Sequence, residues 1–353
     1  MALRVAITGA TGNVGSRLLD RLQADARVTS IVGIARRRPE GHRWTSEGGG
    51  VWVEADIATD DLRPHLEGAD AVVHLAWLFQ PTHRPMVTWR SNAVGSARVL
   101  AAAADAGVGT VVHASSVGAY SPAPDRWVTE SWPTHSMPTA AYGREKAYVE
   151  RLLDAFEARN PEVRVVRMRP SFIFQSQAAT QQRRLFAGPA LPGSLVVSGR
   201  LPFLPVPPGL RFQAVHADDV AEAYHLALAS DARGPFNLAS EPVMTADLLA
   251  ELLGTRPLEV PRPLMRAGVA LSWRAHLTPA DPALLDLVLG LPLLDTTRAR
   301  DELGWVPRHS ATDAVQELLD GIAEGAGGSS APLAPDSATG RLRELAGGVG
   351  ERP

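Results

Sequence analysis

A tyrosine and a lysine stand four residues apart in the stretch "AAYGREKAYVE", as Tyr142 and Lys146. In a helix, residues at i and i+4 lie on one face, so the phenol and the ammonium are expected to be neighbours. A phenol with a pKa of about 10 is a poor acid–base group at neutral pH. A nearby ammonium favours the phenolate and lowers this pKa by about 1–3 units. The pair therefore predicts a phenol that exchanges protons with a substrate.

A serine is expected to complete this arrangement. The buried-type run "VVHASSVGAY" delivers Ser115 and Ser116 to the carboxyl end of a strand, which is where ligands lie in a doubly wound sheet. Ser116 can hydrogen-bond a substrate oxygen and position it for proton exchange with Tyr142, while a nicotinamide exchanges hydride with the same carbon. This combination predicts redox chemistry between a carbonyl compound and an alcohol.

The segment "TGATGNVG" follows a strand and opens a helix, which is the place where a dinucleotide pyrophosphate is bound. Glycines let the backbone turn tightly and approach the phosphates, and unpaired N–H groups at the helix start stabilise negative charge. The alternative is a glycine-rich turn without a ligand. The residues expected to contact the cofactor here are Gly9, Thr11, Gly12, Asn13, Val14 and Gly15.

The second strand indicates which dinucleotide is bound. Where an acidic residue would hold a ribose 2′-hydroxyl, the chain has Ala35, followed by three arginines of which Arg36 is the best candidate for a 2′-phosphate. NADP(H) is therefore favoured and NAD(H) remains possible; a solvated basic turn is the alternative reading. After the third strand, Asp56 is expected to reach the adenine amine, with Ile57 beside the ring. The next strand should bring further cofactor contacts, from Leu75 and Ala76.

These residues need a scaffold that holds them at one edge of a sheet. Strands that alternate with helices predict an α/β fold with a doubly wound parallel sheet, the Rossmann fold. Strands are expected at Val5–Ile7, Val28–Ala35, Val51–Glu54, Ala71–Leu75, Val111–Ala114 and Val163–Met168, and helices at Val14–Ala24, Ser91–Ala106 and Ala141–Ala158.

The sequence changes in texture after Arg169, which predicts a second, smaller lobe. Residues 176–211 are rich in Pro, Gly and Gln and are expected to be mostly loop, whereas 241–322 are mainly helical from an N-cap at Thr245. The dinucleotide-binding domain is expected at 1–168 plus about 212–240, and the mostly helical substrate lobe at about 169–211 and 241–322. The low-complexity residues 323–353 predict a disordered tail.

Composition limits the function classes. The chain has 353 residues, no cysteine and a formal net charge of −3, so disulfides and thiol chemistry are excluded and a nucleic acid or membrane partner is not expected. The N-terminus lacks the pattern of a signal peptide, so a cytoplasmic protein is expected. The ten histidines are scattered without metal-ligand spacing, and no metal is expected. His216 is expected to be structural, with Asp218 and Asp219 as helix N-caps.

The chain resembles the extended short-chain dehydrogenase/reductase superfamily, also called the NAD-dependent epimerase/dehydratase family, from about Val5 to Ile322. The resemblance rests on "TGATGNVG", "VVHLA", "SSVGAY", the YxxxK pair, "RMRPSFIF", "VHADDVA" and "LGWVP". It implies a catalytic triad of Ser116, Tyr142 and Lys146, in which the lysine also holds the nicotinamide ribose. It further implies that Asn92 supports the lysine through a water, and that the chain forms a homodimer through the helices near Ser91–Ala106 and Ala141–Ala158.

The substrate is expected to be a small, partly apolar molecule rather than a nucleotide sugar. Sugar-nucleotide members often carry an asparagine where this chain has Ser171, and Arg211 stands one residue away from its usual place. Aromatic residues could line an apolar pocket, namely Trp77, Phe79 and Phe172. An NADP-dependent reductase or dehydrogenase is favoured. The alternatives are a nucleotide-sugar epimerase or dehydratase with tightly bound NAD, and a catalytically silent NADP-binding regulatory protein.

Overall fold

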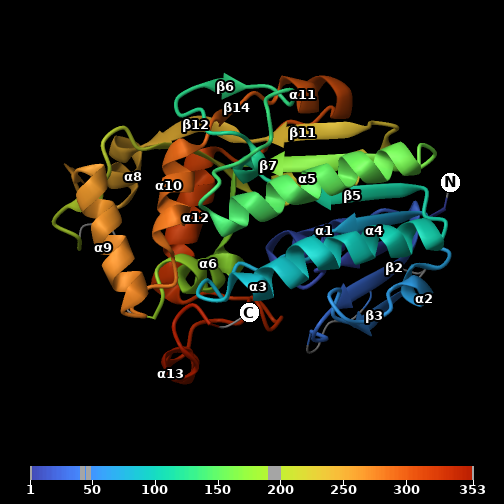
Figure 1. Cartoon of the computed structure of the whole chain (residues 1–353), viewed down its shortest axis with the longest axis horizontal. Coiled ribbons are helices and arrows are strands. Elements are labelled where there is room, and N and C mark those ends of the chain that lie inside the picture. Colours follow the sequence, from blue (N-terminus) through green and yellow to red (C-terminus); the bar gives the residue numbers. More distant parts are fainter. Residues whose placement is uncertain (1, 40–43, 45–48, 190–199, 352–353) are drawn as a thin grey trace.

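The computed structural model describes residues 2–39, 44, 49–189 and 200–351. Its centre is a seven-stranded sheet in which all neighbouring strands are parallel (Figure 1). In sheet order the strands are β11 (Gly234–Leu238), β7 (Arg164–Pro170), β5 (Thr110–Ala114), β4 (Ala71–His74), β1 (Leu3–Thr8), β2 (Val28–Ala35) and β3 (Gly50–Glu54). The strand order reverses between β1 and β4, so the crevice expected to bind ligands lies at their carboxyl ends.

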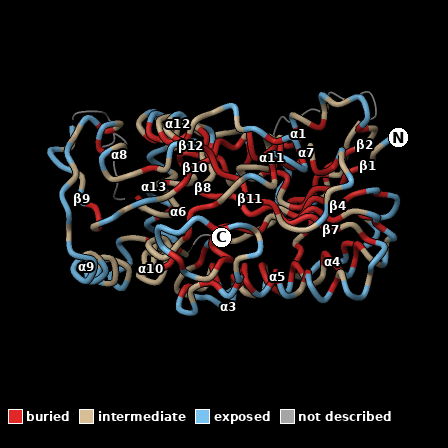
Figure 2. Tube along the Cα trace, turned by 90° about the horizontal axis from the view of Figure 1, so that it is seen from above, coloured by how far each residue is buried: buried red, intermediate tan, exposed pale blue. Residues whose placement is uncertain are grey.

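Helices cover both faces of this sheet, which explains why its strands are apolar on both sides (Figure 2). On one face, α1 (Asn13–Gln23) packs against α7 (Ala217–Ala229) with Leu18 and Tyr224 in the core. The other face carries α2 (Arg63–Leu66), α4 (Gly95–Asp105) and α5 (Ala141–Arg159). The predicted doubly wound α/β fold is confirmed, with the expected strands and helices in place to within a few residues.

The second lobe is built on a three-stranded sheet in the order β12 (Ser240–Thr245), β10 (Arg211–His216) and β8 (Phe172–Phe174). Two short parallel pairs join β9 (Leu204–Val206) to β13 (Pro257–Glu259), and β6 (Trp127–Val128) to β14 (Leu293–Leu294). The lobe's helices are α6 (Ala179–Phe186), α8 (Ala246–Leu252), α9 (Arg262–Arg274), α10 (Pro282–Gly290), α11 (Thr297–Leu303) and α12 (Ala311–Glu324).

Two expectations for this lobe need correction. Residues 176–211 were expected to be mostly loop, but they contain α6 and β9, because Ala178, Ala179 and Thr180 are buried against α12; residues 190–199 lie outside the described part of the chain. Helix α7 is capped by the His216 ring, which accepts the Asp218 N–H, and not by an aspartate. The N-cap at Thr245 is confirmed, since its side chain accepts the Leu248 N–H.

The segment after α12 is structured, which differs from the expected disordered tail. Residues 325–351, here called the C-terminal strap, include helix α13 (Ala338–Gly347) and bury Leu333 and Val349. The Ser330 hydroxyl donates to the carbonyl oxygen of Thr11 at 2.7 Å, and Glu351 forms an ion pair with Arg84 at 2.6 Å. Composition suggested little to bury, but a few well-placed contacts hold the strap across the chain.

Candidate active site

The glycine-rich loop connects β1 to α1 at the point where the strand order reverses. Gly9 has a positive φ of 72°, and a Cβ there would lie 2.6 Å from the backbone nitrogen of Ala76. Helix α1 begins after Gly12 with no side-chain cap and no acidic residue in its first turn. Its first N–H groups therefore favour an anion, and the loop fits a dinucleotide pyrophosphate. Leu75 and Ala76 lie beside this loop, as expected, since the Leu75 N–H donates to the Thr8 oxygen.

A glutamine that the sequence analysis missed closes the loop from the second lobe. Gln175 is fully buried, and its amide donates to both the backbone and the side-chain oxygen of Asn13, at 2.8 and 2.7 Å. The Asn13 amide in turn donates to the Ile173 oxygen. No sequence pattern marks a single glutamine after a short strand as a site residue. Its hydrogen bonds to Asn13 nevertheless join the second lobe to the start of α1.

The residues expected around the adenosine half lie at the neighbouring strand ends. Arg36 is exposed directly after β2, while Ala35 is buried. Glu54, at the end of β3 beside Ala35, accepts the Arg38 N–H at 3.0 Å. Asp56 accepts the Ala58 N–H in the turn after β3, and Ile57 is buried next to α4. Their contacts with a cofactor remain predictions.

The structure brings Ser116, Tyr142 and Lys146 together beyond the end of β5. The Ser116 hydroxyl accepts the Gly118 N–H at 3.0 Å and is hydrogen-bonded to the Tyr142 phenol. The Lys146 ammonium lies 5.8 Å from the Tyr142 ring centre and donates to the Ala114 oxygen at 2.7 Å. The helix places both side chains on the face that looks at β5, as the spacing predicted.

The expected lowering of the Tyr142 pKa is wrong. Burial raises the pKa of Tyr142 to about 12, outweighing the hydrogen bond from Ser116, and the carboxyl group of Glu145 adds to the increase. Burial also lowers the pKa of Lys146 to about 7. The phenol is therefore protonated at neutral pH, and the amine exists in both forms.

Aromatic rings from the loop after β4 enclose the pair. The Phe79 ring is stacked on Tyr142 with 4.9 Å between ring centres, and the Lys146 ammonium lies 3.4 Å from the centre of the Trp77 ring. Phe186 of α6 meets Phe79 edge-on, a contact that the sequence analysis missed. Phe172 instead packs within the second lobe's aromatic cluster, 6.2 Å from Phe174 and 5.7 Å from Phe212.

Asn92 lies in a short π-helical turn (Arg90–Val94) after helix α3 (Pro85–Trp89). Its amide donates to the Leu78 oxygen and its own oxygen accepts the Leu78 N–H, both at 2.7 Å. The second amide hydrogen goes to Glu145 at 2.6 Å. Asn92 thus holds the aromatic loop, and its expected support of the lysine through a water stays a prediction.

A buried ion cluster behind the site was also missed. Glu150 is fully buried on α5 and forms ion pairs with Arg169 at 2.8 Å and Arg167 at 3.0 Å, both from β7. The Ser115 hydroxyl donates to the same carboxylate at 2.6 Å. These arginines hold the pKa of Glu150 near 2 despite its burial. The cluster fixes α5 against the serine-bearing loop.

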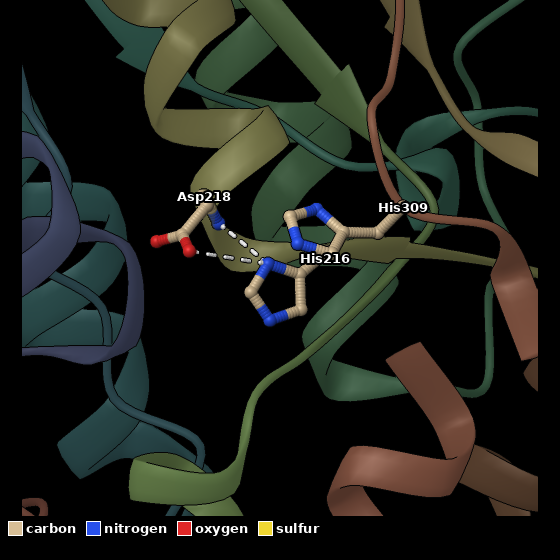
Figure 3. Close-up of side chains that lie close together, drawn as sticks. All are labelled: His216, Asp218 and His309. Carbon is tan, nitrogen blue, oxygen red and sulfur yellow. Dashed lines mark hydrogen bonds and ion pairs between the residues drawn. The ribbon is translucent and has the colours of Figure 1, made fainter. Parts of the chain in front are cut away.

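One group of side chains in the described residues has metal-ligand chemistry, although no metal was expected: His216, Asp218 and His309 (Figure 3). Both ring nitrogens of His216 already have partners, the Asp218 N–H at 3.2 Å and the Glu317 carboxylate at 2.9 Å. His309 is held through Nδ1 by Asp219 at 3.0 Å. The group therefore acts as a cap and junction between β10, α7 and α12.

No helix in the described residues is long and apolar enough to cross a membrane.

The chain combines a doubly wound sheet, a glycine loop after the first strand and a YxxxK helix. The family model described as "NAD dependent epimerase/dehydratase family" matches residues 5–239, and the chain belongs to this family.

Three known proteins illustrate the similarity. An uncharacterised protein of Mycobacterium tuberculosis is 27% identical over 90% of this chain, but the chain spans only 30% of its length. A 4-hydroxy-2-methyl-3-oxo-4-farnesyl-3,4-dihydroquinoline-1-oxide ketoreductase of Stigmatella aurantiaca is 27% identical over 90% of this chain and 96% of its own length. The structure of UDP-glucose-4-epimerase from Stenotrophomonas maltophila, with bound NAD and formylated UDP-arabinopyranose, aligns with a TM-score of 0.68 at 23% identity, over 91% of this chain and 98% of that one.

Proposed function

We propose that the protein is an NADP-dependent reductase that converts the carbonyl group of a partly apolar small molecule to an alcohol. The observation that carries this proposal is the cluster of Ser116, Tyr142 and Lys146 at the end of β5, in which the serine and the lysine are buried and the Phe79 ring is stacked on the half-buried tyrosine. The glycine loop and Lys146 would hold the dinucleotide, which supplies the hydride when bound.

The protonation states of the cluster support the direction of reduction. A phenol that stays protonated at neutral pH can give its proton to the carbonyl oxygen as the carbon receives hydride. Ser116 would hold the same oxygen by a hydrogen bond. The amine of Lys146, with a pKa of about 7, is present in both forms and can return a proton to the phenolate.

The walls of the site support an apolar substrate. Trp77, Phe79 and Phe186 come together from the loop after β4 and from α6, and such rings favour a flat or branched apolar group over a charged diphosphate. The Stigmatella relative is named as a ketoreductase of a farnesyl-bearing dihydroquinoline oxide, a substrate of this chemical kind.

The preference for NADP(H) over NAD(H) is supported by the end of β2. Arg36, Arg37 and Arg38 are all exposed there, and guanidinium donors match the oxygens of a 2′-phosphate. The carboxylate of Glu54, at the end of the neighbouring strand, already accepts the backbone N–H of Arg38.

A nucleotide-sugar epimerase is the second candidate, and the aligned epimerase structure with a UDP-sugar favours it. The two functions differ in cofactor turnover. A reductase consumes NADPH in proportion to product, whereas an epimerase converts its sugar with no net change in the dinucleotide.

The test is a panel of aryl and prenyl ketones, with UDP-sugars in parallel, followed by NADPH absorbance and product analysis. We expect stoichiometric NADPH consumption with an apolar ketone, falling by roughly 1,000-fold or more in Tyr142→Phe. Full activity in that variant, or sugar conversion without NADPH consumption, would refute the proposal.

We also propose a homodimer through α4 and α5. Two apolar side chains on these elements have large exposed fractions: Val94 (44%), directly before α4, and Tyr148 (42%) on α5. Tyr148 contacts Trp89 with 4.7 Å between ring centres and 50° between ring planes, so the two rings present an exposed aromatic surface that a second copy would cover.

A further inference from the structure

Glu145 is a buried carboxyl group that the proposed chemistry does not use. It is 3% exposed and stands on α5 immediately before Lys146. Its two oxygens accept short hydrogen bonds, one from the Thr88 hydroxyl and one from the Asn92 amide, both at 2.6 Å. Burial raises the pKa of this carboxyl group. Burying a carboxyl group costs free energy of folding even when both oxygens are hydrogen-bonded. We therefore look to the contacts of Glu145 for its role.

Asn92 carries the contact from Glu145 to the aromatic loop. The same amide that donates to Glu145 also donates to the Leu78 oxygen, and the Asn92 oxygen accepts the Leu78 N–H. Leu78 stands between Trp77 and Phe79 in the sequence. A displacement of the Asn92 side chain therefore moves the backbone between the two rings that enclose the catalytic pair.

We propose that Glu145 is a positioning residue: through Asn92 and Leu78 it holds the Trp77 ring over Lys146 and the Phe79 ring on Tyr142. The proposal deepens the proposed function, because the rings it positions form the wall on which an apolar carbonyl compound would lie. Glu145 itself needs no contact with the substrate. It also lines, with Tyr142 and Phe79, a cavity of about 40 Å³.

The charge of Glu145 acts on the same pair. The titratable and charged groups around its carboxyl are Tyr142, Arg144 and Lys146 on α5 and, across the cavity, Asp281. A carboxylate stabilises the Lys146 ammonium and opposes the Tyr142 phenolate. Removing the charge while keeping the hydrogen bond from Asn92 should therefore lower both pKa values.

Lys146 is the only lysine in the sequence, which allows a test without turnover. Protein grown with [13Cε]-lysine gives one ε-methylene signal, and an aromatic ring over the ammonium moves that signal upfield. We expect Glu145→Ala and Asn92→Ala to shift it toward the value of a free lysine, as Trp77→Leu does, and the double variant Glu145→Ala/Asn92→Ala to add little. The matched control is Glu162→Gln, an exposed acid that follows α5.

Glu145→Gln separates position from charge, because a glutamine oxygen still accepts the Asn92 amide. We expect this variant to keep the upfield signal while its pH titration midpoint falls below that of the wild type. The proposal is overturned if Glu145→Ala leaves the signal in place while Trp77→Leu moves it, or if Glu145→Gln titrates at the wild-type pH. Because neither readout needs a substrate, a failure of the reductase assay would leave this test intact. Far-UV circular dichroism checks that each variant is folded.

Discussion

The ammonium of Lys146 lies 3.4 Å from the centre of the Trp77 ring and donates to the Ala114 oxygen at 2.7 Å. A cation over an indole in a buried site gains about 2 kcal/mol. Lys146 is expected to bind the nicotinamide ribose, so a bound dinucleotide has to compete with this ring for the same group. Binding of the ribose would therefore have to replace the contact between Lys146 and the indole.

Trp77→Leu should for this reason tighten NADPH binding. Loss of about 1–2 kcal/mol of competing interaction corresponds to roughly a 5- to 30-fold lower Kd. Equilibrium titration by NADPH fluorescence measures the change. Trp127→Leu is the control, since Trp127 is 51% exposed on β6. Weaker binding in Trp77→Leu would instead mean that the indole is part of the cofactor's own contact surface.

Arg36→Ala tests which dinucleotide is bound. Since only NADPH carries the 2′-phosphate, its Kd should rise by roughly 10- to 100-fold, while that of NADH stays within about twofold. The matched control is Arg159→Ala, which removes an arginine from the last turn of α5. Equal losses for both dinucleotides would show that Arg36 supports the fold of the loop rather than reading the phosphate.

Because of the ion cluster around Glu150, the free energy of unfolding should depend on pH in the acidic range. Its pKa is about 2 in the folded protein, against a usual value of 4.5, so its contribution is complete above about pH 4.5 and is lost as the pH falls toward 2. A difference of this size corresponds to about 3 kcal/mol. Urea unfolding at pH 7 and at pH 3 measures the loss.

Glu150→Gln is expected to remove most of this pH dependence and to destabilise the protein at pH 7 by about 3–5 kcal/mol, because the buried Arg169 loses its ion-pair partner and Arg167 keeps only Asp154 and Glu157. Glu162→Gln, which is exposed, should change neither value. A Glu150→Gln protein that keeps the wild-type slope between pH 3 and pH 7 would point to other carboxylates as the source.

Removal of residues 326–353 should destabilise the remaining chain. Arg183 on α6 is 4% exposed and is paired with Glu344 of the C-terminal strap at 3.3 Å, with Asp336 close by. Truncation removes both carboxylates from this guanidinium, and breaking such a buried pair costs about 3–5 kcal/mol. Urea unfolding tests this, and Arg183→Met in the truncated chain should recover part of the loss. Equal stability of the full and truncated chains would show that the strap contributes no net free energy.

Tyr148→Glu should convert the proposed dimer to a monomer, because it places a charge in the centre of an apolar contact surface. Size-exclusion chromatography with light scattering gives the mass directly. Leu271→Glu on α9, at a site that is 71% exposed, is the control and should leave the mass unchanged. A chain that is monomeric without any substitution would contradict the proposal at once.

The backbone of the site could be predicted because each element follows a short-range rule. Tyr142 and Lys146 meet since i and i+4 lie on one helix face, and Ser116 joins them since parallel strands end at one edge. What the sequence does not contain is the choice of rotamer and partner. The stacking of Phe79 on Tyr142 depends on Asn92, fourteen positions from Leu78, and no local pattern links them.

The buried ion cluster could not be predicted from the sequence for a related reason. Glu150, Arg167 and Arg169 resemble solvent-facing residues when taken singly, and only the crossing of α5 over β7 makes them a cluster. The pKa of Tyr142 was misjudged because the spacing to Lys146 is visible in the sequence, whereas the depth of the site is not. In the C-terminal strap, low complexity concealed single anchoring residues such as Leu333.

The hydrogen bond from Ser330 to Thr11 joins residues 319 positions apart. At a synthesis rate of about 5–20 residues per second, the dinucleotide loop would leave the ribosome roughly 15–60 s before the serine that covers it. The crevice also needs β4, which is synthesised later than the loop but well before Ser330, so a nascent chain would pass through a stage in which the crevice is formed and the contact from Ser330 is still missing. Dinucleotide in the surrounding solution could then bind in the crevice before synthesis of the chain is complete.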